Sequence, residues 1–276
     1  FSSVCGLLVL ACGPAGADYS SNPRAQAFVD DMVVRHGWDA QQLKQVLSQA
    51  QRQQAVIDSI QRPAESKTWA QYQDIFITTK RIQGGAEFWD EHAATLTRAE
   101  EHFGVPAQII VAILGVETYY GERMGSYRVI DTLVTQAFEF PVEAWRSRFG
   151  IQQLESMFLL AREQGFDPLE LKGSYAGAMG YGQFIPTSYR AYAVDFDGDG
   201  FRDIWNNPTD AIGSVANYLS EHGWQRGSDI TLPVEGASVP EDVFNVSLKP
   251  SKTIAELETL GMKAAVGYWR TDRLKV

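Results

Sequence analysis

The sequence predicts a mainly α protein with a small appended α+β lobe, and two observations support this fold class. Apolar residues recur at helical spacing, with short glycine and proline breaks, through most of the stretch from Arg24 to about His222. Beyond it the pattern changes, because Ile230 to Val234 and Val243 to Leu248 favour strands and Ile254 to Leu260 favours a short helix. The dominant part of the fold is therefore helical.

The helical elements can be placed in order along the chain. Several short helices follow one another between Arg24 and Gly104. Gly104-Val105-Pro106 then opens a strongly apolar helix that runs through Leu114, since proline is tolerated in the first turn of a helix. Ile151 to Gln164 and Thr209 to His222 predict two more helices.

Four segments follow from these patterns. Residues 1–17 are the expected remnant of an export signal, 18–103 an N-terminal α lobe, 104–228 a central core and 229–276 the small α+β lobe. A chain of 276 residues is long enough to bury a sizeable core and to divide in this way.

The charge balance narrows the classes of partner. Asp and Glu total 34 against 24 Lys and Arg, so the formal net charge is −10. Such a chain has no general affinity for nucleic acid or for an anionic lipid surface. A neutral or mixed-charge partner fits better.

The two cysteines, Cys5 and Cys12, both lie near the start of the chain, so the predicted core has neither a disulfide nor a thiolate metal site. Val4 to Ala11 form a short apolar run, and the small residues that follow it end in Ala15-Gly16-Ala17, as in the later part of an export signal. Val9-Leu10-Ala11-Cys12 also resembles a lipoprotein cleavage box, so membrane attachment through a lipidated Cys12 stays open beside soluble release. No other apolar run approaches the roughly 20 residues that span a bilayer.

A single carboxylate lies on the apolar face of the helix that follows Gly104-Val105-Pro106. Ile110, Ile113 and Leu114 precede Glu117 by seven, four and three residues, so the four side chains share one helix face. Loss of water around the ionised carboxylate, together with the C-terminal end of the helix dipole, raises the pKa of such a Glu. A carboxyl group of this kind can donate a proton near neutral pH.

Other interpretations of this part of the sequence stay open. Glu117 could pair with a buried Arg, or the helix could fray and expose it. Glu122 could be proposed as the acid instead, but it follows Gly121 and precedes Arg123, which is typical of a solvated surface residue. We therefore predict Glu117 as the acid.

A glycine-rich segment from Gly173 to Pro186 has the composition of a sugar-binding loop. Its glycines allow the backbone to approach a ligand closely. Tyr181 and Phe184 offer flat apolar faces to sugar rings, while Ser174 and Gln183 can hydrogen-bond hydroxyl or acetamido groups. The alternative is a glycine-rich turn that packs against a helix; a phosphate loop is excluded, because no Gly-Lys-Ser/Thr ending is present.

A short acidic segment matches the first half of a helix-loop-helix calcium pattern. Asp195, Asp197 and Asp199 stand at positions one, three and five, and Gly200 stands at position six. Three carboxylates so close together predict a bound cation, against the alternative of a solvated acidic turn.

The rest of this loop departs from the usual pattern. Position twelve holds Asn206 in place of the closing Glu, and Asp210 is the nearest carboxylate that could fold back. The backbone carbonyl of Phe201 can serve at position seven. We expect an extended calcium site with a structural role, because oxygen ligands would leave little of the cation's shell open.

Four separated motifs, in this order, resemble the B family of lytic murein transglycosylases. The resemblance covers most of the chain from about Trp69 to Trp224 and is weaker outside. It implies a lysozyme-like catalytic core over residues 104–228, flanked by the α lobe and the small β-containing lobe. The motifs are Gly104-Val105-Pro106, Gly115-Val116-Glu117-Thr118, Gly173 to Pro186 and Asp195 to Tyr218.

The resemblance also implies roles for single residues. Glu117 is similar to the family's catalytic acid/base. Ser174, Gln183 and Tyr218 fall where that family contacts the sugar and its acetamido groups, and Tyr72, in Trp69-x-x-Tyr72, is a further candidate. The family's calcium loop aligns with Asp195, Asp197, Asp199, Phe201 and Asp210.

Two departures from the family pattern concern the substrate groove. Where the family has a Pro-Arg-Arg run, this chain has Pro141-Val142-Glu143, so contacts to the stem peptide would pass to Arg146 or Arg148. The family continues with a tyrosine-rich C-terminal segment that closes one wall of the groove. Because this chain stops at Val276, we expect a shortened small lobe and an incomplete groove.

The expected reaction is the cleavage of peptidoglycan glycan strands in the periplasm with one acid/base. Ordinary glycosidases use two carboxylates, whereas one well-placed carboxylate is evident here. Glu117 would protonate the β-1,4 oxygen between N-acetylmuramic acid and N-acetylglucosamine, then take a proton from the muramyl 6-hydroxyl as a 1,6-anhydro ring closes. No organic cofactor is expected, and cell-wall synthesis proteins are candidate partners. A hydrolytic muramidase and a non-catalytic peptidoglycan-binding module are the alternatives.

Overall fold

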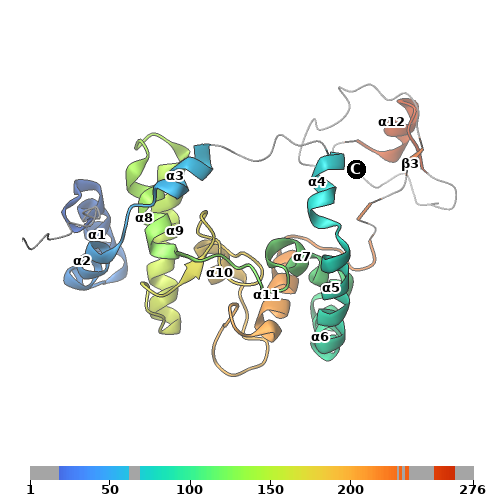
Figure 1. The fold of residues 1–276 in the computed structure, drawn as a ribbon, viewed down its shortest axis with the longest axis horizontal. Coiled ribbons are helices and arrows are strands. Elements are labelled where there is room, and N and C mark those ends of the chain that lie inside the picture. The colour runs from blue at the N-terminus through green and yellow to red at the C-terminus, as the bar shows by residue number, and fades with distance from the viewer. Residues whose placement is uncertain (1–18, 62–68, 229, 232–233, 236–251, 265–276) are drawn as a thin grey trace, which may run out of the picture. The chain divides into compact units, whose positions relative to one another are not determined.

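The computed structural model of the protein describes residues 19–61, 69–228, 230–231, 234–235 and 252–264 (Figure 1). Helices dominate these residues, which confirms the mainly α prediction, and the strands form two short antiparallel pairs, β1 with β2 and β3 with β4. In chain order the elements are η1 (Tyr19–Ser21), α1 (Pro23–His36), α2 (Ala40–Gln49), α3 (Gln54–Gln61), α4 (Trp69–Phe76), α5 (Thr79–Glu91), α6 (Ala93–Phe103), α7 (Ala107–Thr118), β1 (Tyr127–Arg128), α8 (Val129–Glu139), α9 (Trp145–Gln164), β2 (Lys172–Gly173), α10 (Pro186–Tyr192), α11 (Pro208–Glu221), β3 (Val234–Glu235), α12 (Ile254–Thr259) and β4 (Lys263–Ala264).

The described residues form two compact units. The first extends to Trp224, and in it α7 packs against α5, α6 and α11. The second begins at Gln225 and contains β3, α12 and β4. The division falls shortly before the predicted start of the small lobe at residue 229, while the finer boundary predicted between residues 103 and 104 stays a prediction.

Helices α8 and α9 pack closely against each other. All of α8 from Val129 to Phe138 is buried. A Cβ atom at Gly150 of α9 would lie 2.4 Å from the backbone nitrogen of Ala137, so glycine permits this approach. Arg24 of α1 donates to the carbonyls of Ala137, Phe138 and Phe140, and thereby satisfies acceptors that the end of α8 leaves open.

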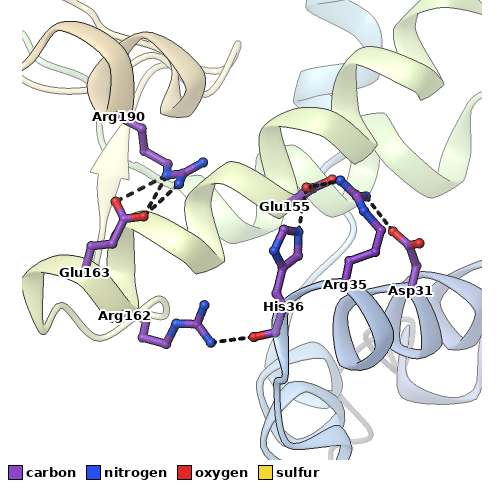
Figure 2. A network of polar contacts seen from close by, with 7 residues as sticks. All are labelled: Asp31, Arg35, His36, Glu155, Arg162, Glu163 and Arg190. Carbon is purple, nitrogen blue, oxygen red and sulfur yellow. Dashed lines mark hydrogen bonds and ion pairs between the residues drawn. The ribbon is translucent and has the colours of Figure 1, made fainter.

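A polar network ties α1 to α9, and a neighbouring ion pair ties α9 to α10 (Figure 2). Glu155 of α9 accepts from Arg35 at 2.8 Å, and the His36 ring nitrogen lies 2.8 Å from the same carboxylate. Glu163, farther along α9, lies 2.7 Å from Arg190 of α10. Partly exposed ion pairs of this kind each contribute little to the free energy of unfolding, about 0 to 1 kcal/mol. We therefore expect these pairs to help align the helices with one another more than to stabilise the fold.

Helix α7 has clear start and stop signals. The Glu100 carboxylate of α6 accepts from the backbone N–H of Ala107 at 2.9 Å, and Pro106 precedes that first residue. The helix ends where Tyr119 takes a left-handed conformation with a φ of 59°. The predicted start at Gly104-Val105-Pro106 is therefore confirmed.

Some predicted boundaries differ from the structure. Helix α9 begins at Trp145 and not at Ile151. The strand predicted from Ile230 is wrong at its start: Ile230 lies in a bend and is 62% exposed, so its apolar character does not reflect burial. The predicted strand at 243–248 and the predicted export signal at 1–17 lie outside the described residues. The predicted helix from Ile254 is confirmed as α12, which a capping box opens.

Over the described part of the chain, no single helix is long and apolar enough to cross a membrane. Helices α6 and α7 meet that criterion only together, as a pair bent by 113°.

Candidate active site

Glu117 is the penultimate residue of α7 and lines a groove of about 390 Å³. The apolar face that leads to it is buried at Ile110 and Leu114 and half-buried at Ile113. Glu117 itself is exposed, so the expectation that it lies on the buried apolar face of the helix is wrong. The buried face ends at the groove, which solvent reaches. Helices α7, α10 and α11 and the glycine-rich loop supply the lining residues: Ile113, Glu117, Gly182, Gln183, Phe184, Ile185, Ser188, Val215, Tyr218 and Leu219.

The groove holds the Glu117 carboxyl in a partly desolvated position. Although the residue as a whole is exposed, partial burial of the carboxyl by the surrounding protein raises its pKa above the ordinary value. Among the described residues, no hydrogen bond or ion pair compensates for the lost water. The described residues therefore do not support the interpretation that Glu117 pairs with a buried Arg. The shift favours the neutral form of the carboxyl relative to an ordinary Glu.

The turn after Glu117 fastens the end of α7 to its neighbours. Tyr119 and Tyr120 both adopt left-handed backbone conformations, with φ of 59° and 60°. The Tyr120 hydroxyl donates to the carbonyl of Arg81 at 2.9 Å, and its ring fills a narrow slot in which a Cβ atom at Gly115 would collide with it. Non-glycine residues keep such a backbone only where the surrounding structure enforces it.

Glu122 lies outside the groove. It is exposed, and its carboxylate lies 3.6 Å from the Lys80 ammonium. It lines a separate hollow between α5 and the Tyr119 to Glu122 turn. This position agrees with the prediction that Glu122 is a surface residue.

The glycine-rich loop folds back on itself beside the groove. Met179 forms one isolated antiparallel β-bridge with Gly173 and another with Phe184. Gly180 has a φ of 66°, and a Cβ atom there would lie 2.5 Å from the carbonyl oxygen of Ile204, so this close approach requires glycine. Gln183 has a φ of 51°, a strained conformation for its residue type.

Side-chain hydrogen bonds fix two of the polar residues of this loop. The Gln183 amide donates to the carbonyls of Met124 at 3.2 Å and Gly180 at 3.1 Å. The Ser174 hydroxyl accepts from the backbone N–H groups of Ala176 at 3.3 Å and Ala178 at 3.2 Å. Hydrogen bonds within the protein therefore hold the loop in this shape.

The groove brings together four of the predicted site residues, namely Glu117, Gln183, Phe184 and Tyr218. Ser174, Tyr181 and Tyr72 are not among its lining residues. The Tyr181 ring packs over Gly121, and burial raises the pKa of its hydroxyl. Tyr72 is exposed on α4, 5.0 Å from the Phe76 ring.

Sequence reasoning missed several apolar residues of the groove wall. On α11, Val215 precedes Tyr218 by three residues and Leu219 by four, and this helical spacing is the signal that could have found it. Ile185 and Ser188 come from the loop end and α10, and their position depends on how these elements pack.

The acidic loop brings three of the predicted calcium ligands together. Oxygen atoms of Asp195, Asp197 and Asp210 all lie within 4.8 Å of one another. Asp199 is not in this group, and its carboxylate accepts from the Phe201 N–H at 2.8 Å. Carboxylate oxygens from an open loop and a buried helix start form a donor set suited to calcium.

Asp210 anchors this acidic loop to the first turn of α11. It is fully buried and accepts from the N–H groups of Phe196 at 2.7 Å and Asp203 at 2.8 Å. Burial raises its pKa, against the lowering by these hydrogen bonds. Asn206, at position twelve of the pattern, instead donates its backbone N–H to Asp203.

Known proteins resemble this chain over most of its length. The Transglycosylase SLT domain model matches residues 20–276. Membrane-bound lytic murein transglycosylase B of Escherichia coli K12 is 46% identical over 231 residues, which cover 80% of this chain and 63% of that protein. The chain thus spans less than two thirds of the length of this curated relative.

Solved structures share the fold. Soluble lytic transglycosylase SltB1 of Pseudomonas aeruginosa matches with 46% identity and a TM-score of 0.83, covering 87% of this chain and 81% of that one. Slt35 of E. coli in complex with calcium matches with 42% identity and a TM-score of 0.82, covering 92% and 80%. SltB3 of P. aeruginosa in complex with NAG-anhNAM-pentapeptide matches with 31% identity and a TM-score of 0.75, covering 94% and 68%.

The family match extends across Glu117, the glycine-rich loop and the acidic loop. The resemblance to lytic transglycosylases is thereby confirmed, and the chain belongs to the Transglycosylase SLT domain family.

Proposed function

We propose that the protein is a lytic transglycosylase that cleaves the β-1,4 bond between N-acetylmuramic acid and N-acetylglucosamine in peptidoglycan. The observation that carries this proposal is the position of Glu117: its carboxyl lines a groove, has a pKa raised by burial, and forms no ion pair among the described residues. Membership of the family supports the class of reaction.

In the proposed mechanism Glu117 acts twice. As the bond between C1 and the glycosidic oxygen breaks, the protonated carboxyl gives its proton to that oxygen. The substrate's own acetamido oxygen stabilises the positive charge at C1. The muramyl 6-hydroxyl oxygen then attacks C1, and the Glu117 carboxylate takes the hydroxyl proton. The products are a free N-acetylglucosamine hydroxyl and a 1,6-anhydro ring, and the carboxyl ends in its starting form.

The lining of the groove supports a reaction with one carboxylate. Glu117 is the sole acidic residue among the described residues that line it. Hydrolysis with two carboxylates would need a second acidic group about 5 to 9.5 Å away across the bond. An intramolecular hydroxyl as nucleophile removes that requirement.

We assign sugar binding to Gln183, Phe184 and Tyr218, which share the groove with Glu117. Both aromatic side chains offer flat apolar faces, and the amide of Gln183 can exchange hydrogen bonds with an acetamido group. Ser174 would act through the shape of the loop that it caps. Tyr181 and Tyr72 stay as proposed contacts outside the groove lining.

Arg146 is the better of the two candidates for a stem-peptide carboxylate. Its buried Nε atom lacks a hydrogen-bond partner, and its guanidinium carbon lies 3.8 Å from the centre of the Trp145 ring. Burial lowers the pKa of Arg146, a sign of a cation that lacks full compensation. Arg148 already donates to the carbonyl of Glu143 at 2.6 Å.

We propose that the acidic loop holds a structural calcium ion through Asp195, Asp197 and Asp210. The three carboxylates approach within 4.8 Å of one another, and the buried one adds like charge that a divalent cation would neutralise. Bound there, the ion would fix the loop to the start of α11 and take no part in bond cleavage. The relative Slt35 has been solved with calcium.

We place the protein in the periplasm, where peptidoglycan lies, either released or anchored through Cys12. Glycan strands are its proposed substrate, and cell-wall synthesis proteins are further proposed partners. No organic cofactor enters the mechanism.

The deciding experiment is mass spectrometry of the fragments that the purified protein releases from isolated sacculi. We expect 1,6-anhydromuramyl ends, and Glu117→Gln should still sediment with sacculi but release no fragments. Reducing ends would instead identify a hydrolytic muramidase. Binding without release by the unmodified protein would identify a non-catalytic peptidoglycan-binding module, and lysis by Glu117→Gln would remove Glu117 from the mechanism.

A further inference from the structure

We propose that His222 is a positioning residue that holds the Tyr218 ring in place for the glycan. This inference rests on the proposed function, because it gives Tyr218 a role in binding the sugar chain. It concerns a residue that does not line the groove, and it follows from contacts at the end of α11.

The imidazole of His222 stacks on the Tyr218 ring. The ring centroids are 4.0 Å apart and the ring planes differ by 25°. The His222 Nδ1 atom also lies 2.7 Å from the carbonyl oxygen of Tyr218. Because a carbonyl can only accept, Nδ1 carries the hydrogen in this contact, and the ring orientation is fixed by two independent interactions.

Two more aromatic residues complete the surroundings of Tyr218. The Tyr192 ring meets Tyr218 edge-on at 5.2 Å and meets His222 at 4.9 Å. The Asn217 amide donates to the Tyr192 carbonyl at 2.9 Å and so fixes the end of α10. Phe184 lies 5.7 Å from Tyr218 and lines the groove beside it.

The position of Tyr218 in the fold makes such support useful. Tyr218 lies in the last turn of α11, which ends at Glu221, and Gly223 follows with a φ of 88°. Helix ends fray, and an unsupported side chain there would have to be ordered when the sugar binds, which lowers affinity. A preformed stack avoids that cost. His222 is exposed, so its replacement should have a small effect on global stability.

The stack and the hydrogen bond can be tested separately with three substitutions. His222→Phe keeps a flat ring but removes the donor, His222→Asn keeps a donor but removes the ring, and His222→Ala removes both. Each protein is assayed for kcat and KM on soluble glycan strands prepared from sacculi, and its Tm is recorded. A matched control is His102→Ala, an exposed histidine that contacts an aromatic ring, Phe103 at 4.5 Å, away from the groove.

We expect His222→Ala and His222→Asn to raise KM about 3- to 10-fold, the range of one aromatic pair, with kcat within about twofold of the unmodified protein. His222→Phe should restore KM to within about twofold, and His102→Ala should leave it unchanged. In a Tyr218→Ala background, His222→Ala should have no further effect on KM, because the two residues act through one contact.

Three results would overturn the proposal: an unchanged KM in His222→Ala, a lowered kcat without a change in KM, or additive effects with Tyr218→Ala. Binding to sacculi is measured in parallel with all proteins carrying Glu117→Gln, so affinity is obtained without turnover. If the unmodified protein releases no anhydro fragments, the proposed function fails, whereas the effect of His222 on binding is still read from this second assay.

Discussion

Thr118 donates its hydroxyl hydrogen to the carbonyl of Tyr181 at 2.8 Å, which joins the residue after Glu117 directly to the glycine-rich loop. The same hydroxyl oxygen accepts from the backbone N–H of Gly121 at 3.0 Å. Thr118 is 1% exposed, so its hydroxyl takes these protein partners in place of water. Thr118 is therefore one of the contacts that set the distance between the proposed acid and the loop that carries Gln183, beside the Gln183 amide on the Met124 carbonyl.

Replacing Thr118 with Val should therefore affect both stability and turnover. The shape is kept, but the half-buried Tyr181 carbonyl and Gly121 N–H lose their partner, and about 1 to 3 kcal/mol for each group is the upper bound, which applies when the group is left fully unsatisfied. We expect a lower urea midpoint and a reduced kcat. Thr118→Ser keeps the hydroxyl and serves as the control. Equal activity and stability of the Val and unmodified proteins would show that the loop is positioned by other contacts.

The raised pKa of Glu117 predicts the pH dependence of cleavage. The first step needs the protonated carboxyl, so kcat/KM should be high at low pH and fall as the pH rises through the raised pKa of Glu117. This decline should occur at a higher pH than for an ordinary Glu. Rates on soluble glycan between pH 4 and 9 give the profile, and a decline at the pH of an unshifted Glu would contradict the desolvated site.

The same shift predicts how stability depends on pH. The folded protein holds the Glu117 proton more tightly than the unfolded chain, so the resulting stabilisation is complete below the unfolded pKa and is lost as pH rises through the folded pKa. Glu117→Gln cannot titrate. Its Tm relative to the unmodified protein should therefore increase from acidic to neutral pH, as thermal scans at several pH values would reveal. A difference in Tm that is independent of pH would contradict this prediction.

Some helices could be predicted from sequence because their signals are local, whereas α8 and α10 were not predicted. Gly104-Val105-Pro106 and the apolar repeat that follows predicted α7, and the pattern from Ile254 to Leu260 predicted α12. The start of the strand expected from Ile230 was wrong because β-forming residues alone do not show which face is buried. Ile230 is 62% exposed.

A residue of the groove could be predicted from sequence only where its own type and its neighbours in the chain indicate its role. A carboxylate at the end of an apolar helix is visible in the sequence, and so are the glycines of the loop. The roles of Ile185, Ser188 and Val215 depend on how α10 and α11 pack beside α7, which no local pattern specifies. His222 is also invisible to pattern analysis, because its contact with Tyr218 depends on the geometry of the end of α11.

Arg146 should distinguish glycan that bears peptides from glycan that does not. Its guanidinium has no ion-pair partner among the described residues and lies against the exposed Trp145 ring. We expect Arg146→Ala to raise KM several-fold for strands with stem peptides and to leave KM unchanged for strands from which an amidase has removed them. Arg148→Ala is the control and should affect neither. Equal effects on both substrates would remove the peptide carboxylate as the ligand of Arg146.

Calcium should stabilise the protein through the three carboxylates that meet in the structure. A ligand that binds only the folded state at 100 times its Kd adds about 2.7 kcal/mol, so calcium should raise the Tm and EGTA should reverse the rise. Asp197→Asn and Asp210→Asn should abolish most of this shift, because their oxygens belong to the cluster. Asp199→Asn should keep it, since that carboxylate accepts the Phe201 N–H and lies outside the cluster.

The change in Tm between calcium and EGTA, and not the Tm of each variant alone, shows whether a residue binds calcium. Asp210 also accepts two backbone N–H groups, from Phe196 and Asp203, so Asp210→Asn should lower the Tm even in EGTA. Magnesium should produce a smaller shift at equal concentration, because it requires near-octahedral geometry and gives up its water reluctantly. If Asp199→Asn abolished the shift while Asp197→Asn kept it, calcium would bind with the ligands of the regular loop pattern, and the cluster around Asp210 would instead be a feature of folding alone.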